Sequence, residues 1–144
     1  MQFIKINEKC AIYNLLTEFQ DVFPHLMDKI SNLEDYAEKL SELAYVYSAE
    51  KNGESVGILI FYANDSESKE AYISLIGVKK ENERKGIGKA LLDYCFKLSR
   101  KHGMCKIRLE VDKDNSNAIK FYKKNGFSFC NATGHNSFYM QKEI

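Results

Sequence analysis

Residues 79–101 are where the sequence concentrates groups that could bind an anion. They include eight Lys/Arg against three Asp/Glu, and in their middle Gly86-Ile87-Gly88 opens an apolar helical pattern. The first N–H groups of a helix have no intrahelical acceptor and lie at the positive end of the helix dipole. Glycines let those N–H groups come close to a phosphate. The pattern therefore indicates a phosphate-binding helix N-terminus, and a tight turn with exposed lysines is the alternative.

Two common phosphate motifs do not fit this stretch. A Walker loop requires glycine and Ser/Thr where the sequence has Glu83 and Ala90. A dinucleotide-binding fingerprint requires a third glycine where Leu91 stands, and it is expected near the beginning of a parallel sheet. Neither a Walker-type nucleotide site nor a dinucleotide site is favoured.

The cysteines and histidines form no metal-binding pattern. The four cysteines include no CxxC pair, and the three histidines do not cluster. We therefore expect no metal site, and we expect reduced, mostly buried thiols.

Composition and charge restrict the class of protein. The chain has 144 residues, 44% hydrophobic and 28% charged, which is typical of a globular protein. A net charge of +1 provides no overall field for nucleic acid or an anionic membrane. The longest uncharged run, residues 55–64, is too short for a membrane helix of about 20 residues. We expect one cytoplasmic domain, residues 1–144, that carries no secretory signal and binds neither nucleic acid nor a membrane.

The apolar periodicity predicts the element order β-α-α-α-β-β-β-α-β-α-β-β. Asn52-Gly53 between two apolar runs indicates a hairpin turn, and residues 55–63 indicate a central strand covered on both faces. We expect strands near 3–6, 44–50, 55–63, 71–78, 106–111, 127–130 and 137–141, and helices near 8–20, 23–30, 31–43, 86–102 and 114–126. These elements would form one mixed sheet with helices on both faces.

Two segments together resemble the GNAT superfamily of N-acyltransferases. Residues 83–88, Glu-Arg-Lys-Gly-Ile-Gly, follow a strand and resemble its motif A, Gln/Arg-x-x-Gly-x-Gly/Ala. Residues 115–127 resemble its motif B through Asn115, Ala118, Phe121, Tyr122, Gly126 and Phe127. Glu83 departs from motif A, and so does Lys80, where proline is common. The resemblance is strong over residues 71–127 and rests on topology before them.

The resemblance implies an α/β fold of the α+β type. Its sheet would be mixed, mostly antiparallel and twisted, with about seven strands, splayed between the fourth and fifth. Acetyl-CoA, as co-substrate, would lie in that gap, with no metal. Backbone groups of Ile76 and Val78 would pair with the pantetheine arm, and Gly77 would favour the bulge that opens the sheet.

The resemblance also implies which residues hold the rest of the co-substrate. Backbone N–H groups of one loop would bind the pyrophosphate: Arg84, Lys85, Gly86, Ile87, Gly88 and Lys89. Asn115 would line the thioester end, although a plain helix N-cap also explains it and the two roles are compatible.

The implied reaction is transfer of an acetyl group to a primary amine, by direct attack through a tetrahedral intermediate. Tyr122 matches the general acid of many members, with core packing as the alternative. Glu110 precedes Tyr122 by twelve residues, which resembles the strand glutamate that acts as base in bacterial ribosomal-protein N-terminal acetyltransferases. Its alternative is a carboxylate that faces solvent or pairs with a lysine. Tyr72 and Ser74 are fallback polar groups.

The acceptor stays open between a small-molecule amine and a peptide amine, and a homodimer through the C-terminal strands is a further expectation. The non-enzymatic alternative is an acyl-CoA-binding or sensing module. Glu83 keeps that alternative open, because a carboxylate in motif A opposes phosphate binding.

Overall fold

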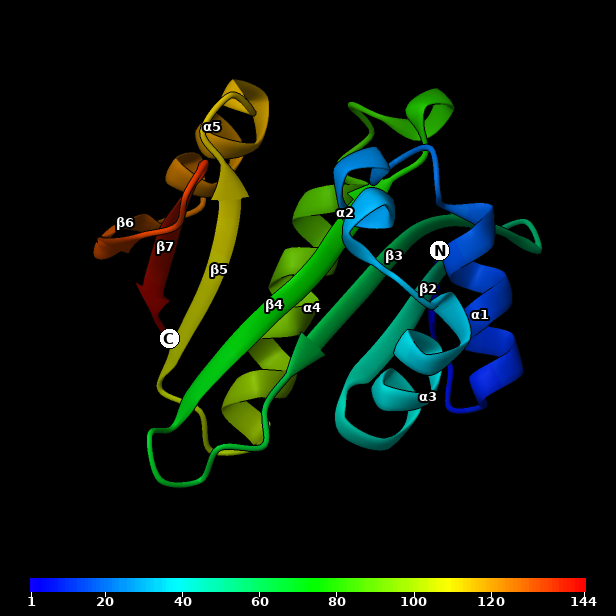
Figure 1. Cartoon of the computed structure of the whole chain (residues 1–144), viewed down its shortest axis with the longest axis horizontal. Coiled ribbons are helices and arrows are strands. Elements are labelled where there is room, and N and C mark those ends of the chain that lie inside the picture. The colour runs from blue at the N-terminus through cyan, green and yellow to red at the C-terminus, as the bar shows by residue number, and fades with distance from the viewer.

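The computed structural model describes the backbone of residues 1–144 and every side chain except those of residues 132 and 133. Over these residues the chain forms a seven-stranded mixed sheet with helices on both faces (Figure 1). The strand order is β1-β2-β3-β4-β5-β7-β6, and β4–β5 is parallel while the other neighbours are antiparallel. The predicted fold class and element order are confirmed.

The element bounds lie close to the predicted ones. The strands are β1 Gln2–Lys5, β2 Tyr45–Lys51, β3 Glu54–Tyr62, β4 Glu70–Val78, β5 Lys106–Asp112, β6 Ser128–Thr133 and β7 Ser137–Glu143. The helices are α1 Lys9–Glu18, α2 Pro24–Lys29, α3 Leu33–Leu43, α4 Ile87–Lys101 and α5 Ser116–Lys124, with a 3-10 turn at Lys80–Asn82. Among the described residues, no helix is both long enough and apolar enough to cross a membrane.

Local signals in the sequence set several of these bounds. The β2–β3 hairpin turns at Asn52 and Gly53, whose φ angles of 54° and 80° match the turn that favours this pair of residues. The side chain of Asn32 accepts a hydrogen bond from Asp35 N and caps α3. The α4 helix is followed by Gly103 with φ 84°, a conformation that favours glycine after a helix.

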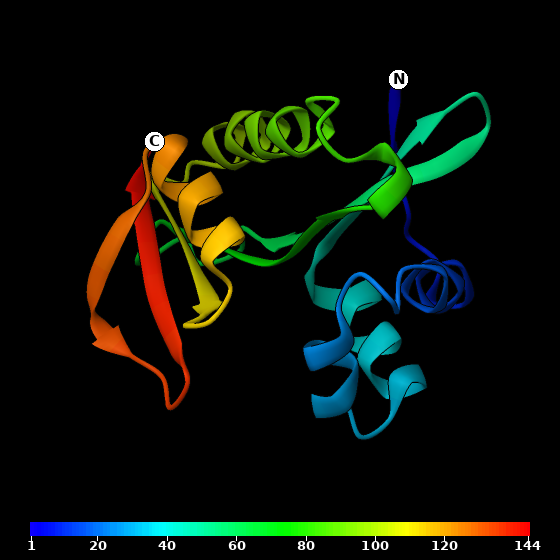
Figure 2. The same cartoon turned by 90° about the horizontal axis from the view of Figure 1, so that it is seen from above.

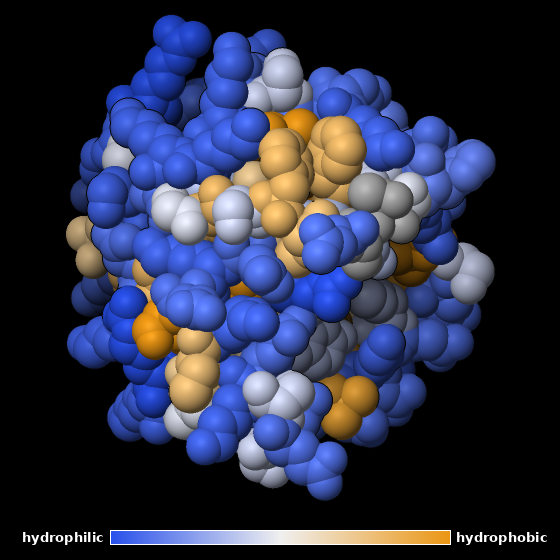
Figure 3. All heavy atoms as spheres, turned by 90° about the vertical axis from the view of Figure 1, so that its left-hand side faces the viewer, coloured by the Kyte–Doolittle hydropathy of each residue, from blue (hydrophilic) through white to orange (hydrophobic). Residues whose placement is uncertain are grey.

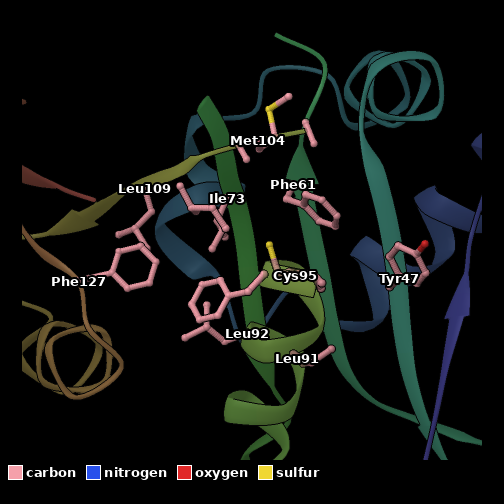
Figure 4. Close-up of a cluster of buried hydrophobic side chains, with 14 of the residues drawn as sticks. Tyr47, Phe61, Ile73, Leu91, Leu92, Cys95, Met104, Leu109 and Phe127 are labelled. Carbon is pink, nitrogen blue, oxygen red and sulfur yellow. The ribbon is translucent and has the colours of Figure 1, made fainter. Parts of the chain in front are cut away.

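Two hydrophobic clusters cover the two faces of the sheet. On one face, α4 packs against the sheet, and its residues Leu91, Leu92 and Cys95 share one cluster with Phe61 and Ile73 of the sheet (Figure 4). On the other face, α1 and α3 pack against a cluster that includes Ile58 and Ile60 of β3. Figure 2 shows α4 on one side of the sheet and α1, α2 and α3 on the other. The predicted central strand, β3, is therefore buried from both sides.

The parallel pairing of β4 with β5 is short. It joins residues 70–73 of β4 to 106–109 of β5, and beyond these residues the two strands diverge (Figure 1). A β-bulge lies at the same point, because Ile60 pairs with Leu75 and Phe61 with Ile73, which leaves Ser74 as the extra residue. The predicted splay between the fourth and fifth strands is thus confirmed.

The prediction that Gly77 forms the bulge is wrong. The bulge is at Ser74, three residues earlier, and Gly77 pairs regularly with Ile58. A Cβ atom at Gly77 would lie 2.5 Å from Phe23 Cζ and 2.8 Å from Val22 Cγ1. Gly77 is needed because the segment between α1 and α2 packs directly against β4.

The prediction of mostly buried cysteines is also wrong. All four cysteines lie among the described residues and are free thiols, but only Cys95 is buried, while Cys10 and Cys105 are exposed and Cys130 is partly buried. Cys95 is at an inward position of α4, whereas the other three lie near element ends or on an edge strand.

A patch of hydrophobic side chains lies on the surface near the C-terminal strands. Figure 3 views this side of the molecule and shows hydrophobic side chains gathered within a mostly hydrophilic face. Phe129 of β6 is 42% exposed, and its ring lies 4.9 Å from that of Phe138 of β7. Lys123 and Lys113 lie over these two rings. The homodimer expected through these strands stays a prediction.

The close contact between α4 and β3 yields a stability prediction. A Cβ atom at Gly57 would lie 2.9 Å from Leu91 Cδ1 and 3.2 Å from the Gly77 carbonyl oxygen. Gly57→Ala should therefore lower the free energy of unfolding by about 1–3 kcal/mol, measured by urea denaturation. Gly88→Ala is the control, because its nearest atom would be Phe121 Cζ at 3.5 Å. Equal stability of the two variants would contradict this packing.

Candidate active site

A cavity of about 640 Å³ lies where β4 and β5 diverge. Residues of α2 and the segment before it line one wall, and β4, β5 and the first two turns of α5 line the others. Glu110, Tyr122, Asn115 and Ile76, four of the residues singled out in the sequence, are all in this lining.

The cavity receives side chains from both faces of the sheet. Glu110 alternates with Leu109 and Val111, which belong to the cluster under α4, so Glu110 projects from the opposite face. Tyr122 packs against the α4 cluster and reaches the cavity from that face. Side chains on opposite faces of a continuous sheet could not meet, and here the divergence of two strands brings them to one cavity.

The wall near Glu110 is polar. Glu110 is exposed, and its Oε2 accepts a hydrogen bond from Ser137 Oγ. The hydroxyls of Ser74 and Tyr36 lie 3.2 Å apart, which fixes Ser74 against α3. Burial, with a smaller contribution from the charge of Glu110, raises the pKa of Tyr72 to about 12. Tyr72 therefore keeps its proton at neutral pH and cannot serve as a general base without a strong perturbation.

Tyr122 is held by aromatic packing. Its ring lies 5.4 Å from that of Phe121 and 5.6 Å from that of Phe127, both edge to face. Burial raises the pKa of Tyr122 well above its ordinary value, and the Cys95 thiol adds to this effect. The hydroxyl is therefore protonated at neutral pH and available as a donor.

Asn115 begins the helix that carries Tyr122. Its Oδ1 accepts a hydrogen bond from Ala118 N at 3.2 Å, which confirms the N-cap interpretation. The cap uses only Oδ1, so the amide nitrogen of Asn115 is not needed for it. Asn115 is also exposed and lines the cavity. The structural role thus leaves the proposed binding role available.

The glycine loop exposes unpaired backbone donors. The first hydrogen bond of α4 runs from Ala90 N to Gly86 O at 3.1 Å, so the N–H groups of Ile87, Gly88 and Lys89 have no intrahelical acceptor. Gly86 has φ 78°, and a Cβ atom there would meet nothing within 4 Å. These three donors lie at the positive end of a 15-residue helix, beside a glycine that adds no side chain.

The basic side chains of this loop differ in how much positive charge they present to a ligand. Arg84 and Lys85 are exposed, and Arg84 has φ 64°, which is uncommon for a residue other than glycine. The ammonium group of Lys89 lies 2.8 Å from Asp93 and turns along α4. Lys89 is therefore partly neutralised, whereas Arg84 and Lys85 retain their charge at the loop.

The edge of β4 that faces the divergence carries free backbone groups. Lys79 N donates a hydrogen bond to Val56 O, so Lys79 is at a hydrogen-bonded position of the β3–β4 pair. Hydrogen-bonded and non-hydrogen-bonded positions alternate along an antiparallel pair. Val78 and Ile76 are therefore at non-hydrogen-bonded positions, and their N–H and C=O groups point away from β3. They point toward β5 beyond the end of its pairing with β4. An extended ligand could add there as a strand.

Sequence reasoning missed two parts of the site. Phe23, His25 and Lys29 line the wall of the cavity that comes from α2, where the sequence offered no motif. The contact of Ser137 with Glu110 was also missed, because 27 residues separate the pair. The sequence predicted the helix but not its place in the site. Gly77 was the one sign that another segment approaches β4 closely, and it does not tell which segment that is.

The arrangement suits transfer of an acyl group between two ligands. A carboxylate and a phenol line one cavity from opposite sides, an extended edge lies beside them, and a helix N-terminus follows that edge. A base and an acid on opposite sides of a reacting carbonyl are what general acid–base catalysis requires. Among the described residues, no group of three or more His, Cys, Asp or Glu side chains is arranged to hold a metal ion.

Two curated relatives match part of the chain. Uncharacterized protein YdhI of Bacillus subtilis is 36% identical over 93 residues, which cover 64% of this chain and 54% of that protein. Spermidine N(1)-acetyltransferase of Thermoplasma acidophilum is 39% identical over 66 residues, which cover 46% of this chain and 40% of that protein. The chain thus spans about half the length of the curated relatives it matches.

Solved structures share the fold over the whole chain. The PaiA N-acetyltransferase of Thermoplasma acidophilum, in complex with coenzyme A, has a TM-score of 0.75 and 22% identity, and the match covers 100% of both chains. A match to the Acetyltransferase (GNAT) family extends over residues 10–127 and includes both the glycine loop and the helix of Tyr122. Since this match covers most of the sequence, the chain belongs to the GNAT acetyltransferase family.

Proposed function

We propose that this protein is an N-acetyltransferase that moves an acetyl group from acetyl-CoA to a primary amine. The proposal rests chiefly on one observation, the cavity at the divergence of β4 and β5 that Glu110 and Tyr122 line from opposite faces. Spermidine, named in one relative at 39% identity, is itself an amine and is consistent with this class of acceptor.

The residues present fit acetyl-CoA. The free edge at Ile76 and Val78 suits the amides of the pantetheine arm, which are spaced along an extended chain. The N–H groups at the start of α4, with Arg84 and Lys85 beside them, suit the pyrophosphate. Asn115, next to the cavity, suits the acyl end. Acetyl-CoA supplies an activated thioester carbonyl, and the chain supplies its orientation and the proton transfers.

The proposed roles divide the proton transfers between two residues. Glu110 accepts a proton from the attacking amine, directly or through a water molecule. Tyr122 donates a proton to the departing thiolate, since its raised pKa keeps it protonated. The amine reaches the carbonyl from the α2 and α3 side, and the thiol leaves toward the α4 and α5 side.

The distribution of charge supports an acceptor that is cationic before it reacts. Residues 1–78 carry 13 Asp/Glu and 6 Lys/Arg, a net charge of −7, whereas residues 79–144 carry 7 and 15, a net charge of +8. The first half supplies the α2 wall, and the second half supplies the glycine loop. In the cavity lining, Asp21, Glu110 and Asp112 outnumber Lys29, which favours the approach of an ammonium ion, whereas the basic glycine loop favours an anionic co-substrate.

Thiol release from acetyl-CoA tests the function directly. Release of free CoA that requires an added amine, followed with a thiol reagent across amino acids, polyamines, amino sugars and peptides, identifies an enzyme. Binding of acetyl-CoA by calorimetry with no release for any amine would instead favour the acyl-CoA-binding module.

The glycine loop gives the first functional prediction. Gly86→Val should weaken acetyl-CoA binding at least about 10-fold, which is about 1.4 kcal/mol, because the side chain enters the space before the α4 donors. Gly103→Val is the matched control, since Gly103 has φ 84° and the same open surroundings at the other end of α4. Calorimetry that finds equal affinities in the two folded variants would remove the pyrophosphate from this loop.

Loss of the Tyr122 hydroxyl is the second functional prediction. Tyr122→Phe keeps the edge-to-face packing and should lower kcat by about 10²-fold or more, with little change in acetyl-CoA affinity. Tyr47→Phe is the control, because Tyr47 is also a buried tyrosine with a raised pKa, of about 12, but lies outside the cavity lining. Wild-type turnover by Tyr122→Phe would show that the thiolate leaves without this donor.

Loss of the Glu110 base is the third functional prediction. Glu110→Gln keeps the shape of the side chain and should lower kcat by about 10²–10⁴-fold, with a shallower rise of rate with pH. Wild type and variant must be compared with one acceptor, because the amine also loses a proton as pH rises. Glu143→Gln, a substitution of an exposed carboxylate at the end of β7, is the control. An unchanged rate and pH profile would assign Glu110 a structural role only.

A further inference from the structure

The turn between β6 and β7 lies against one oxygen of the Glu110 carboxylate. Asp112 pairs with Ser137 and Glu110 with Tyr139, so Ser137 is the diagonal neighbour of Glu110 on the same face. Ser137 Oγ donates a hydrogen bond to Glu110 Oε2. Ser137 is only 5% exposed, whereas Glu110 is exposed to the cavity. A buried donor thus holds an accessible carboxylate.

The backbone fixes the place of this donor. Gly134 N donates to Ser137 O at 3.1 Å and closes the turn, and Lys113 N donates to Asn136 O at 3.0 Å and ties the turn to the end of β5. A Cβ atom at Gly134 would lie 2.9 Å from Glu110 Oε2 and would also meet Ser137 Oγ. The backbone of the turn therefore lies close against the carboxylate, at a position where a side chain would not fit.

A hydrogen bond to one oxygen has a direct consequence for the other. An unrestrained glutamate on a strand samples several rotamers, and a charge-assisted hydrogen bond selects among them. Among the described residues, no hydrogen bond joins Oε1 to another side chain. With Oε2 bound to Ser137, Oε1 is the oxygen left to take a proton from a ligand in the cavity.

We propose that Ser137 is a positioning residue, whose hydroxyl holds Glu110 Oε2 so that Oε1 meets the proton of the acceptor amine. This inference rests on the proposed role of Glu110 as base. A different role for Ser137 would be purely structural, as a satisfied hydroxyl that stabilises the pairing of β5 with β7. The two roles predict different results when Glu110 is replaced. A positioning role requires the Glu110 carboxylate, whereas a structural role does not.

A double-mutant cycle separates these roles. Turnover is measured by thiol release for wild type, Ser137→Ala, Glu110→Gln and the double variant, at saturating acetyl-CoA and amine. Ser137→Ala should lower kcat about 10-fold with KM for acetyl-CoA unchanged, because a misplaced catalytic group costs rate rather than co-substrate binding. In the Glu110→Gln background it should change kcat less than about 2-fold, because an uncharged amide takes no proton wherever it points.

Two further variants control for folding. Ser99→Ala removes the hydroxyl of another buried serine, in α4 and outside the cavity lining, and should leave kcat unchanged. Gly134→Ala keeps Ser137 but places a Cβ atom against Ser137 Oγ and 2.9 Å from Glu110 Oε2, so it displaces their hydrogen bond; it should lower kcat in wild type and not in Glu110→Gln. It provides the same test if Ser137→Ala does not fold.

Each outcome has a distinct meaning. A wild-type rate for Ser137→Ala together with a slow Glu110→Gln overturns the positioning role and leaves Glu110 as base. Equal losses from Ser137→Ala in both backgrounds overturn it as well, because the effect then bypasses Glu110. A wild-type rate for Glu110→Gln removes the base itself, and the proposal fails for that separate reason.

Discussion

The early end of the β4–β5 pairing is the constraint on which the site depends. Four residues of each strand pair, and the bulge at Ser74 marks the point where pairing stops. Before the bulge, Ile73 faces the α4 cluster; after it, Leu75 faces the α1 and α3 cluster. The bulge therefore exchanges the two faces of β4 and opens the sheet in the same step. It leaves backbone groups at Ile76 and Val78 free, a state that water or a ligand must satisfy.

The opening also explains how residues from different layers share one cavity. Glu110 comes from the face covered by α2 and α3, and Tyr122 comes from the helix beside α4. The contact of Phe23 with Gly77 and the ion pair of Glu18 with Lys79 hold the first half of the chain against the end of β4. The walls thus have separate sequence origins, because α2 and β4 come from residues 1–78, whereas β5 and α5 come from residues 79–144.

The sequence was most informative for turns and helix caps, whose conformation depends on residues adjacent in the sequence. The Asn52-Gly53 turn and the Asn115 cap depend on local backbone geometry, and both were predicted correctly. Gly77 was misassigned because a glycine in a strand has several causes, and here the cause is Phe23, 54 positions away in the sequence. The contact between Ser137 and Glu110 leaves no local pattern at all. Long-range contacts between single side chains are thus what the sequence could not provide.

The two interpretations of Tyr122, as a packing residue and as an acid, are not alternatives. The edge-to-face contact with Phe127 places the ring in the core, while the same residue lines the cavity. Burial disfavours the charged phenolate, so it is packing that raises the pKa of Tyr122. At neutral pH almost no phenolate is therefore present to act as a base, and Tyr122 stands in the protonated form that a donor requires. The hydrophobic contacts that stabilise α5 against the sheet therefore also keep the Tyr122 hydroxyl protonated.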